Sequence, residues 1–149
     1  MGLRQIGRTG TKMKVALDNG AFMPERAHKM DAGIDLRSMI TMRIEPHSSY
    51  LFPTGVHVQL PHGTCGILVS KSGLNAWHGI TSTGLIDEGY TGAIMVNLHN
   101  NSDTSYLVQE GDKISQLVIV PCRYEEIEIV GKLENDTERG NAGFGSTGK

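Results

Sequence analysis

Residues Ala93–His99 read AIMVNLH, and this stretch decides the fold class. Ile94, Val96 and Leu98 occupy every second position of it. A period of two predicts a β-strand with one buried face. The DEG sequence at 87–89, just upstream, is typical of a turn. We therefore expect a tight turn followed by a half-buried strand.

Outward from this strand, the chain is a series of short β-patterned runs separated by Gly, Pro and Asn. The further runs are Met13–Leu17, Gly33–Leu36, Thr41–Glu45, Leu51–Leu60, Cys65–Val69, Lys113–Val120 and Ile127–Val130. Only Ser72–Trp77 has a pattern that favours a helical turn or two. Many short strands at this spacing predict an all-β barrel or jelly roll. No linker-like run divides the 149 residues, which indicates one domain.

The composition excludes several classes of function. The net charge is -2, so the chain lacks the strongly basic field that grips a nucleic-acid backbone. A few local cations would still suffice for a small anionic substrate. The polar start, Met1–Lys14, has no signal-peptide core, and no stretch approaches the ~18 apolar residues of a membrane span. We therefore expect neither secretion nor membrane insertion.

The two cysteines, Cys65 and Cys122, lie far apart in the sequence and outside any CxxC or Cys/His motif. This pattern indicates ordinary buried thiols in a reducing compartment rather than zinc ligands or a redox pair. A cytoplasmic location is the prediction, or the cytoplasm of an infected host cell for a protein encoded by a virus or phage.

The tail, Arg139–Lys149, reads RGNAGFGSTGK and has four glycines among its eleven residues. It cannot bury enough surface to order itself, so we expect a barrel over residues 1–138 and a flexible arm over 139–149. Gly143–Lys149 superficially matches a Walker phosphate loop, but the chain ends where that motif needs a helix. Its glycine amides and hydroxyl groups are nevertheless suited to binding phosphate.

Over nearly its whole length, the chain is similar to the trimeric dUTPase (deoxyuridine triphosphatase) family. Five segments carry the resemblance, in the family's order and spacing. They are Ala32–Ser38 (AGIDLRS), Ser70–Leu74 (SKSGL), Gly84–Asn100 (GLIDEGYTGAIMVNLHN), Gly111–Leu117 (GDKISQL) and Arg139–Gly148 (RGNAGFGSTG). The resemblance implies a jelly-roll-like distorted barrel. It also implies a homotrimer with three active sites, each shared between subunits, and Mg²⁺ on the triphosphate.

The resemblance implies hydrolysis of dUTP to dUMP and pyrophosphate, which keeps uracil out of DNA and supplies dUMP for dTMP synthesis. Asp87 would be the general base that activates water for attack at the α-phosphorus. The ring of Tyr90 would pack on the deoxyribose and exclude a 2′-hydroxyl. The main chain of the hairpin would read uracil, with Gly84, Ile86 and Met95 among the substrate-binding residues.

The remaining implied contacts are to the phosphates and to the metal. Lys71, Ser72 and Gly73 would form a phosphate-binding loop, although the family commonly has arginine where Lys71 stands. Gln116 would reach the phosphates. Asp35 would approach Mg²⁺ through water. The closing arm, from another subunit, would contribute Arg139, Phe144, Gly145, Ser146 and Thr147, with Phe144 stacked over uracil.

Two alternatives remain at this stage. One is a dCTP deaminase, which shares the fold but needs a catalytic glutamate and a cytosine-reading pocket. The other is a nucleotide-sensing regulatory protein that binds a protein partner. The cationic N-terminal segment Met1–Lys14 is only weak support for the second alternative.

Overall fold

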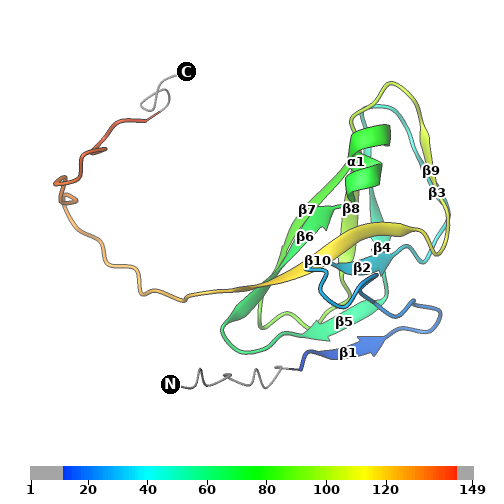
Figure 1. Ribbon diagram of the computed structural model, residues 1–149, viewed down its shortest axis with the longest axis horizontal. Helices are drawn as coiled ribbons and strands as arrows, with labels where there is room; N and C mark the ends of the chain where they lie inside the picture. Colours follow the sequence, from blue (N-terminus) through cyan, green and yellow to red (C-terminus); the bar gives the residue numbers. More distant parts are fainter. Residues whose placement is uncertain (1–11, 144–149) are drawn as a thin grey trace, which may run out of the picture.

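The computed structural model describes residues 12–143, which form ten strands and one short helix (Figure 1). The elements are β1 (Lys14–Leu17), β2 (Ile34–Arg37), β3 (Met42–Ile44), β4 (Ser49–Pro53), β5 (Val56–Gln59), β6 (Thr64–Ser70), α1 (Ser72–His78), β7 (Ile80–Ile86), β8 (Met95–Asn100), β9 (Tyr106–Val108) and β10 (Lys113–Pro121). The prediction of an all-β fold is confirmed.

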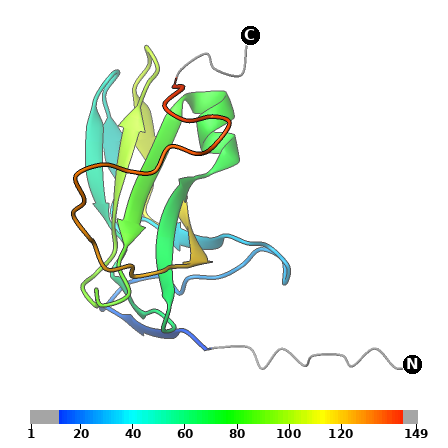
Figure 2. The same ribbon diagram turned by 90° about the vertical axis from the view of Figure 1, so that its left-hand side faces the viewer.

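Six strands form one curled antiparallel sheet in the order β2-β10-β6-β7-β8-β4. Two smaller pairs, β1–β5 and β3–β9, complete the body. The central ladder runs β10–β6–β7, and in it Leu68 of β6 lies opposite both Leu117 of β10 and Gly84 of β7. The sheet wraps around an apolar core, so the body has the shape of an open barrel (Figures 1 and 2).

The alternation predicted around β8 is confirmed. Val96 and Leu98 are buried in the core, whereas Met95 and His99 of the same strand are exposed. Ile94, just before the strand, is fully buried as well. One face of β8 therefore packs on the core, as its period of two requires.

Several predicted boundaries differ from the structure. The run Leu51–Leu60 is two strands, because Gly55 takes a positive φ of 64° and turns the chain between β4 and β5. Strands β7 and β9 were not predicted at all. α1 continues to His78, one residue beyond the prediction, and ends at Gly79 in the left-handed conformation.

The C-terminal segment, residues 122–143, extends away from the body, and we call it the extension (Figures 1 and 2). It leaves the barrel at Cys122, well before the predicted boundary at Arg139. The strand predicted at Ile127–Val130 is absent, and these residues are exposed. Across residues 12–143, no helix has the length and apolar character that a membrane crossing requires.

Candidate active site

The predicted base, Asp87, lies in a turn over residues 87–93 that joins β7 to β8, and we call it the catalytic turn. The amide of Tyr90 donates to the carbonyl of Asp87 at 3.0 Å and closes the turn. At its far end, the amide of Ile94 donates to the carbonyl of Val56 at 2.8 Å. The Asp87 side chain is exposed and takes part in none of the ion pairs found within residues 12–143. It is therefore accessible to a water molecule.

Tyr90 folds back over the catalytic turn. Its hydroxyl donates to the carbonyl of Ala93 at 2.9 Å, and its side chain remains 43% exposed. A Cβ atom on Gly92 would lie 2.5 Å from the hydroxyl oxygen, so glycine at 92 is what lets the ring lie there. The partly exposed ring is thus held in place within the same turn as the predicted base.

Glu88 fastens the catalytic turn to the body. Its carboxylate accepts hydrogen bonds from the His62 ring at 2.7 Å, from the amide of Gly63 at 3.1 Å and from the hydroxyl of Tyr124. The hydrogen bond from Tyr124, followed by that from His62, lowers the pKa of Glu88. The same contact raises the pKa of Tyr124. Glu88 is thus a carboxylate with fixed partners, whereas the side chain of its neighbour Asp87 has none among residues 12–143.

A second group of predicted residues gathers where β2, β10 and β6 meet near α1. Both carboxylate oxygens of Asp35 are paired, one with Lys71 at 2.6 Å and the other with Lys113 at 2.7 Å. The Asp35 side chain is only 4% exposed. Burial alone would raise its pKa, but the hydrogen bonds and charges of Lys113 and Lys71 outweigh burial and lower the pKa of Asp35. We call these three residues the lysine cluster.

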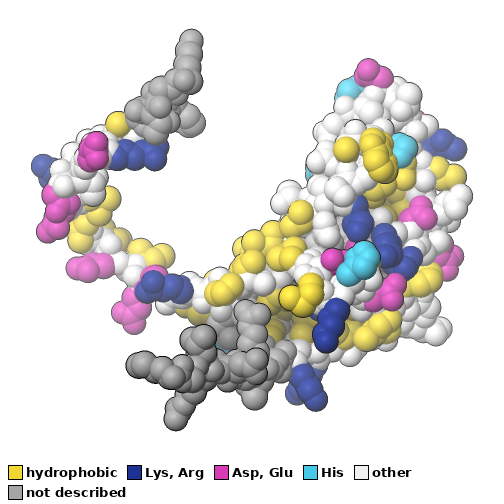
Figure 3. All heavy atoms as spheres, in the orientation of Figure 1, with side chains coloured by type: hydrophobic (Ala, Val, Ile, Leu, Met, Phe, Trp, Pro, Cys, Tyr) yellow, Lys and Arg dark blue, Asp and Glu magenta, His cyan; other side chains and the backbone are white. Residues whose placement is uncertain are grey.

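The predicted phosphate loop adjoins the lysine cluster. Ser72 and Gly73 open α1, directly after Lys71. Gln116 lies opposite Asp35 in the β10–β2 ladder, and its amide donates to the carbonyl of Ser70 at 3.2 Å. The structure therefore brings together Asp35, Lys71, Ser72, Gly73 and Gln116. In Figure 3, basic and acidic side chains intermingle on this side of the body, below α1.

The lysine cluster and the catalytic turn lie at opposite ends of the β6–β7 ladder. Ile86, just before Asp87, pairs with Gly66 near the start of β6, whereas Ser72 follows the end of β6. At about 3.3 Å per residue, on the order of 20 Å of strand separates Asp87 from Ser72. A single chain therefore does not bring the predicted base to the predicted phosphate loop.

Three of the predicted substrate-binding residues border the catalytic turn. Ile86 is buried at the end of β7, and Met95 is exposed at the start of β8. Gly84 lies in β7, where a Cβ atom would come within 2.9 Å of Leu68, so close packing explains glycine there. Arg139 lies far out on the extension and donates to the carbonyl of Ala142 at 3.2 Å. Phe144, Gly145, Ser146 and Thr147 fall outside the described residues.

Sequence reasoning missed three residues that the structure places in these contacts: Lys113, Glu88 and Gly92. Lys113 stands inside the quoted segment GDKISQL, and a cation at the start of a strand was its only signal. The pairing of Lys113 with Asp35 depends on the register of β10 against β2. Cys65 and Cys122 are free thiols that lie close together, and each is half-buried rather than fully buried as predicted. Burial, followed by the nearby Cys122, raises the pKa of Cys65.

The fold and these two groups define a class of protein. It is an all-β protein with an exposed, unpaired carboxylate in one group of described residues and two lysines around a buried aspartate in the other. Comparison with known proteins agrees with this class. A family model described as dUTPase matches residues 19–148. The chain belongs to the dUTPase family, and it is thus a hydrolase of nucleotide metabolism.

Curated relatives and solved structures show the same similarity. The chain is 43% identical over 141 residues to the deoxyuridine 5'-triphosphate nucleotidohydrolase of Gloeothece citriformis, covering 92% of this chain and 97% of the relative. It is 44% identical over 135 residues to that of Clostridium kluyveri, covering 89% and 94%. The dUTPase of Staphylococcus bacteriophage 80alpha, solved with dUPNHPP, aligns with a TM-score of 0.87 at 34% identity, covering 94% of this chain and all of that one.

Two descriptions of solved phage relatives bear on cofactor and partners. A mutant dUTPase from phage phi11 of Staphylococcus aureus, 35% identical with a TM-score of 0.75 and covering 82% and 98% of the two chains, is described as coordinating a structural Mg(II) ion. The phage 80alpha dUTPase is described among phage dUTPases that control the transfer of virulence genes by a G protein-like mechanism.

Proposed function

We propose that this chain hydrolyses dUTP to dUMP and pyrophosphate at active sites shared between the copies of a homotrimer. The observation that carries the proposal is the separation of the catalytic turn from the lysine cluster within one chain. Each group has half of what the reaction needs, namely a base for water in one and phosphate contacts in the other. A neighbouring copy is what would bring the two halves together.

In the catalytic turn, the Asp87 carboxylate would accept a proton from the attacking water and align that water with the α-phosphorus. The ring of Tyr90, held by Ala93 and Gly92, would lie against the deoxyribose and exclude a 2′-hydroxyl. Main-chain groups between Ile86 and Met95 would pair with uracil. A cytosine would leave buried hydrogen-bonding groups unpaired, which is a strong basis for rejection.

On the phosphate side, Ser72, Gly73 and Gln116 would contact the triphosphate. Lys71 and Lys113 would add positive charge there, although both ammonium groups are already paired with Asp35. Two lysines and one aspartate leave this cluster with a net positive charge, which favours an anionic substrate. Arg139 and the arm residues Phe144–Thr147 of another copy would then cover the site.

Magnesium is proposed only as an ion that arrives with the triphosphate. No group of three or more His, Cys, Asp or Glu side chains suited to a metal lies within residues 12–143. Both oxygens of Asp35 are occupied by lysines, so the water-mediated contact predicted for Asp35 does not fit this arrangement. Mg²⁺ commonly binds substrate phosphates and keeps several of its waters, which is compatible with such a site.

The extension supports assembly of several copies. Ile127 and Ile129 are 94% and 95% exposed, and they alternate with glutamates as the residues of a half-buried strand do. Figure 3 shows hydrophobic side chains along the extension and on the flank of the body near its root. A segment with this alternation presents one apolar face when it is extended, and that face needs a surface to cover it. The proposed occupant is a second copy of this chain.

Complementation between two inactive variants tests the shared site. Asp87→Asn and Ser72→Ala are each expected to form inactive trimers. When the two are unfolded together and refolded, mixed trimers should contain some sites with both native residues. With random mixing, about a quarter of the sites should be intact, and pyrophosphate release from dUTP should recover to that level. Each variant refolded alone is the control. Two inactive variants that stay inactive after mixing would contradict shared sites.

The family match favours hydrolysis of dUTP over deamination of dCTP, and pyrophosphate against ammonia release distinguishes the two reactions. In the cell, hydrolysis would keep uracil out of DNA and supply dUMP for dTMP synthesis. We place this activity in the cytoplasm, or in that of an infected host cell if a phage or virus encodes the chain. The two free thiols at Cys65 and Cys122 support a reducing compartment.

A regulatory role through a protein partner is the second candidate, and the description of the phage 80alpha relative favours it. In this role, nucleotide would switch the chain between partner-bound and free states. Pull-down with the protein saturated with dUPNHPP, compared with nucleotide-free protein, tests it. Capture of the same partner to the same extent in both states would contradict a nucleotide switch.

A further inference from the structure

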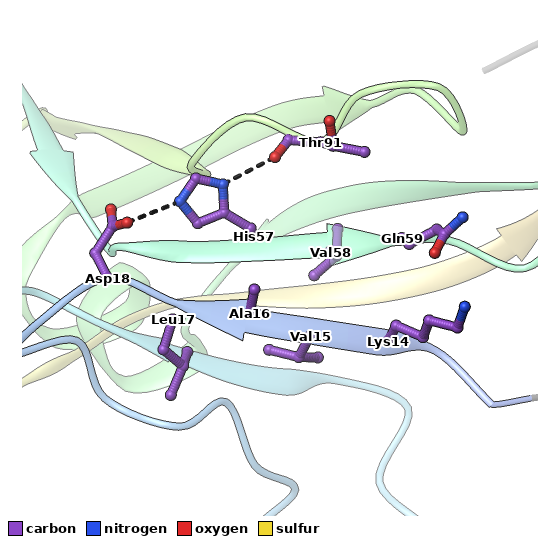
Figure 4. Close-up of a pocket in the computed structure, with 9 residues that line it drawn as sticks. All are labelled: Lys14, Val15, Ala16, Leu17, Asp18, His57, Val58, Gln59 and Thr91. Carbon is purple, nitrogen blue, oxygen red and sulfur yellow. Dashed lines mark hydrogen bonds and ion pairs between the residues drawn. The ribbon is translucent and has the colours of Figure 1, made fainter.

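His57 bridges the body and the catalytic turn, and neither the family segments nor the proposed function uses it (Figure 4). It projects from β5 beside a surface pocket of about 400 Å³ that β1, β5 and Thr91 line. Its Nδ1 lies 2.8 Å from the carbonyl oxygen of Thr91 in the catalytic turn. Its Nε2 lies 3.1 Å from a carboxylate oxygen of Asp18, just after β1. The ring thus ties the residue next to Tyr90 to the body.

Both contacts of the ring are hydrogen-bond acceptors. A neutral imidazole has one N–H and can donate to only one of them. An imidazolium has two N–H groups and satisfies both the carbonyl and the carboxylate. Only the charged ring therefore satisfies both contacts. In agreement, the hydrogen bond to the Thr91 carbonyl, followed by the bond to Asp18, raises the pKa of His57.

We propose that protonated His57 is a positioning residue, which holds the Thr91 carbonyl so that the adjacent Tyr90 is placed for dUTP and against UTP. The inference rests on the proposed role of Tyr90. When the ring loses a proton, the remaining N–H stays with the carboxylate, because the charge-assisted bond is the stronger one. Thr91 then loses its donor, and this end of the catalytic turn becomes looser.

The direction with pH follows from this arrangement. The bond to Thr91 is present while the ring is charged and is lost as the pH rises through the raised pKa of His57. Among the charged groups on the elements packed against the ring, Asp18 contacts it and Lys14 lines the far end of the same pocket (Figure 4). Glu88, on the catalytic turn, is engaged by His62 and Tyr124. The Thr91 carbonyl and, after it, Asp18 therefore raise the pKa of His57, and Asp18 is the charged group that contacts the ring.

The test compares KM and kcat for dUTP, and the preference for dUTP over UTP, across the pH range around neutrality. His57→Leu removes both contacts, and His57→Gln leaves an uncharged donor. At pH values below the pKa of His57, we expect KM for dUTP in each variant to be about fivefold higher than the native KM, with kcat unchanged. A fivefold change corresponds to the loss of one ordinary hydrogen bond. The ratio of variant to native KM should fall to one as the pH rises. This ratio cancels titration of the substrate's own phosphates.

Asp18→Asn tests the pH dependence of KM, which a merely structural role of His57 would leave unchanged. Without the carboxylate, the single N–H of the neutral ring can stay with the Thr91 carbonyl, so KM for dUTP in this variant should rise much less with pH than it does in the native protein. The matched control is His47→Asn, which breaks the exposed pair of His47 with Asp103 at 2.7 Å. This control should leave KM unchanged at every pH.

Binding of the non-hydrolysable dUPNHPP, measured by calorimetry over the same pH range, separates this inference from the proposed reaction. Native protein that releases no pyrophosphate from dUTP would overturn the reaction, and the affinity for dUPNHPP would still report on His57. Folded His57 variants that match the native protein in KM, in affinity for dUPNHPP and in dUTP preference would overturn the inference. A ratio of variant to native KM that does not change with pH would overturn the inference as well.

Discussion

The catalytic turn and the extension both carry predicted site residues, but the chain holds them in different ways. The turn is fastened to the body by hydrogen bonds from His57, His62 and Gly63, and by the bond that the Ile94 amide donates to the Val56 carbonyl. The extension has no strand in the described part of the chain, and two of its isoleucines are almost fully exposed. One chain therefore shapes the base side of the proposed site alone, and in the proposed trimer the covering side would come from other copies.

This difference has a physical cause. A turn of seven residues can be fixed by a few hydrogen bonds, because little backbone freedom has to be lost. The extension is longer and needs to bury apolar surface to become ordered. The core of its own chain offers no such surface, because the sheet already covers it. The following predictions change one region at a time, and they run from the largest expected effect to the smallest.

Asp87→Asn should abolish most of the activity while leaving the fold intact. The substitution keeps the size of the side chain but removes its ability to accept a proton, so kcat should fall by about 10²–10⁴. Pyrophosphate release from dUTP measures the loss, and thermal melting checks the fold. Asp103→Asn, at an exposed surface position, is the matched control. Activity near the native level in Asp87→Asn would assign the base to another residue.

Replacing both Ile127 and Ile129 by lysine should disrupt assembly. If each isoleucine is buried on a neighbouring copy, the pair stabilises the assembly by about 3–6 kcal/mol. Analytical ultracentrifugation should show smaller species, and activity should fall with them because the site is shared. Changing the alternating residues Glu126 and Glu128 to glutamine is the control. A trimer as stable as the native one would remove the extension from the interface.

The same contrast explains what could be predicted from the sequence. Strand β8 was predictable because its alternation reflects packing within the chain. Strand β7, with sequence ITSTGLI, was missed because Thr, Ser and Gly weaken its apolar pattern, and its place between β6 and β8 makes it a strand. Ile127–Val130 has the pattern of a strand but no partner strand in the described chain.

The site was predictable to a similar degree. Asp87, Tyr90 and Ser72 stand in segments whose order and spacing identify the family. The pairing of Lys113 with Asp35, and that of His57 with Thr91, joins residues far apart in sequence. Such contacts depend on strand register and on the path of the turn, which local patterns do not encode.

Tyr90→Phe should test how tightly the catalytic turn is held from within. The ring remains, but its hydrogen bond to the Ala93 carbonyl is lost, at a cost of about 0.5–1.5 kcal/mol. We expect kcat/KM for dUTP to fall by less than about tenfold. Tyr90→Ala, which removes the ring, should lose far more of the preference for dUTP over UTP. Equal preferences in the two variants would assign discrimination to another group.

Glu88→Gln should have the smallest effect, and it acts where the two regions meet. Tyr124, at the root of the extension, donates to this carboxylate in the catalytic turn. The pKa of Glu88 is lowered, so its contribution to stability is present above the ordinary glutamate pKa of about 4.3 and is lost as the pH falls through the lowered value. The variant should melt no more than about 4 °C below the native protein at neutral pH. The difference should vanish in acid. Tyr124→Phe removes only one of the three bonds to Glu88 and should produce a smaller change. The double variant should lose less than the sum of the two single variants, because the bond between Tyr124 and Glu88 is affected in both. Additive effects would show that the turn and the root of the extension are held independently.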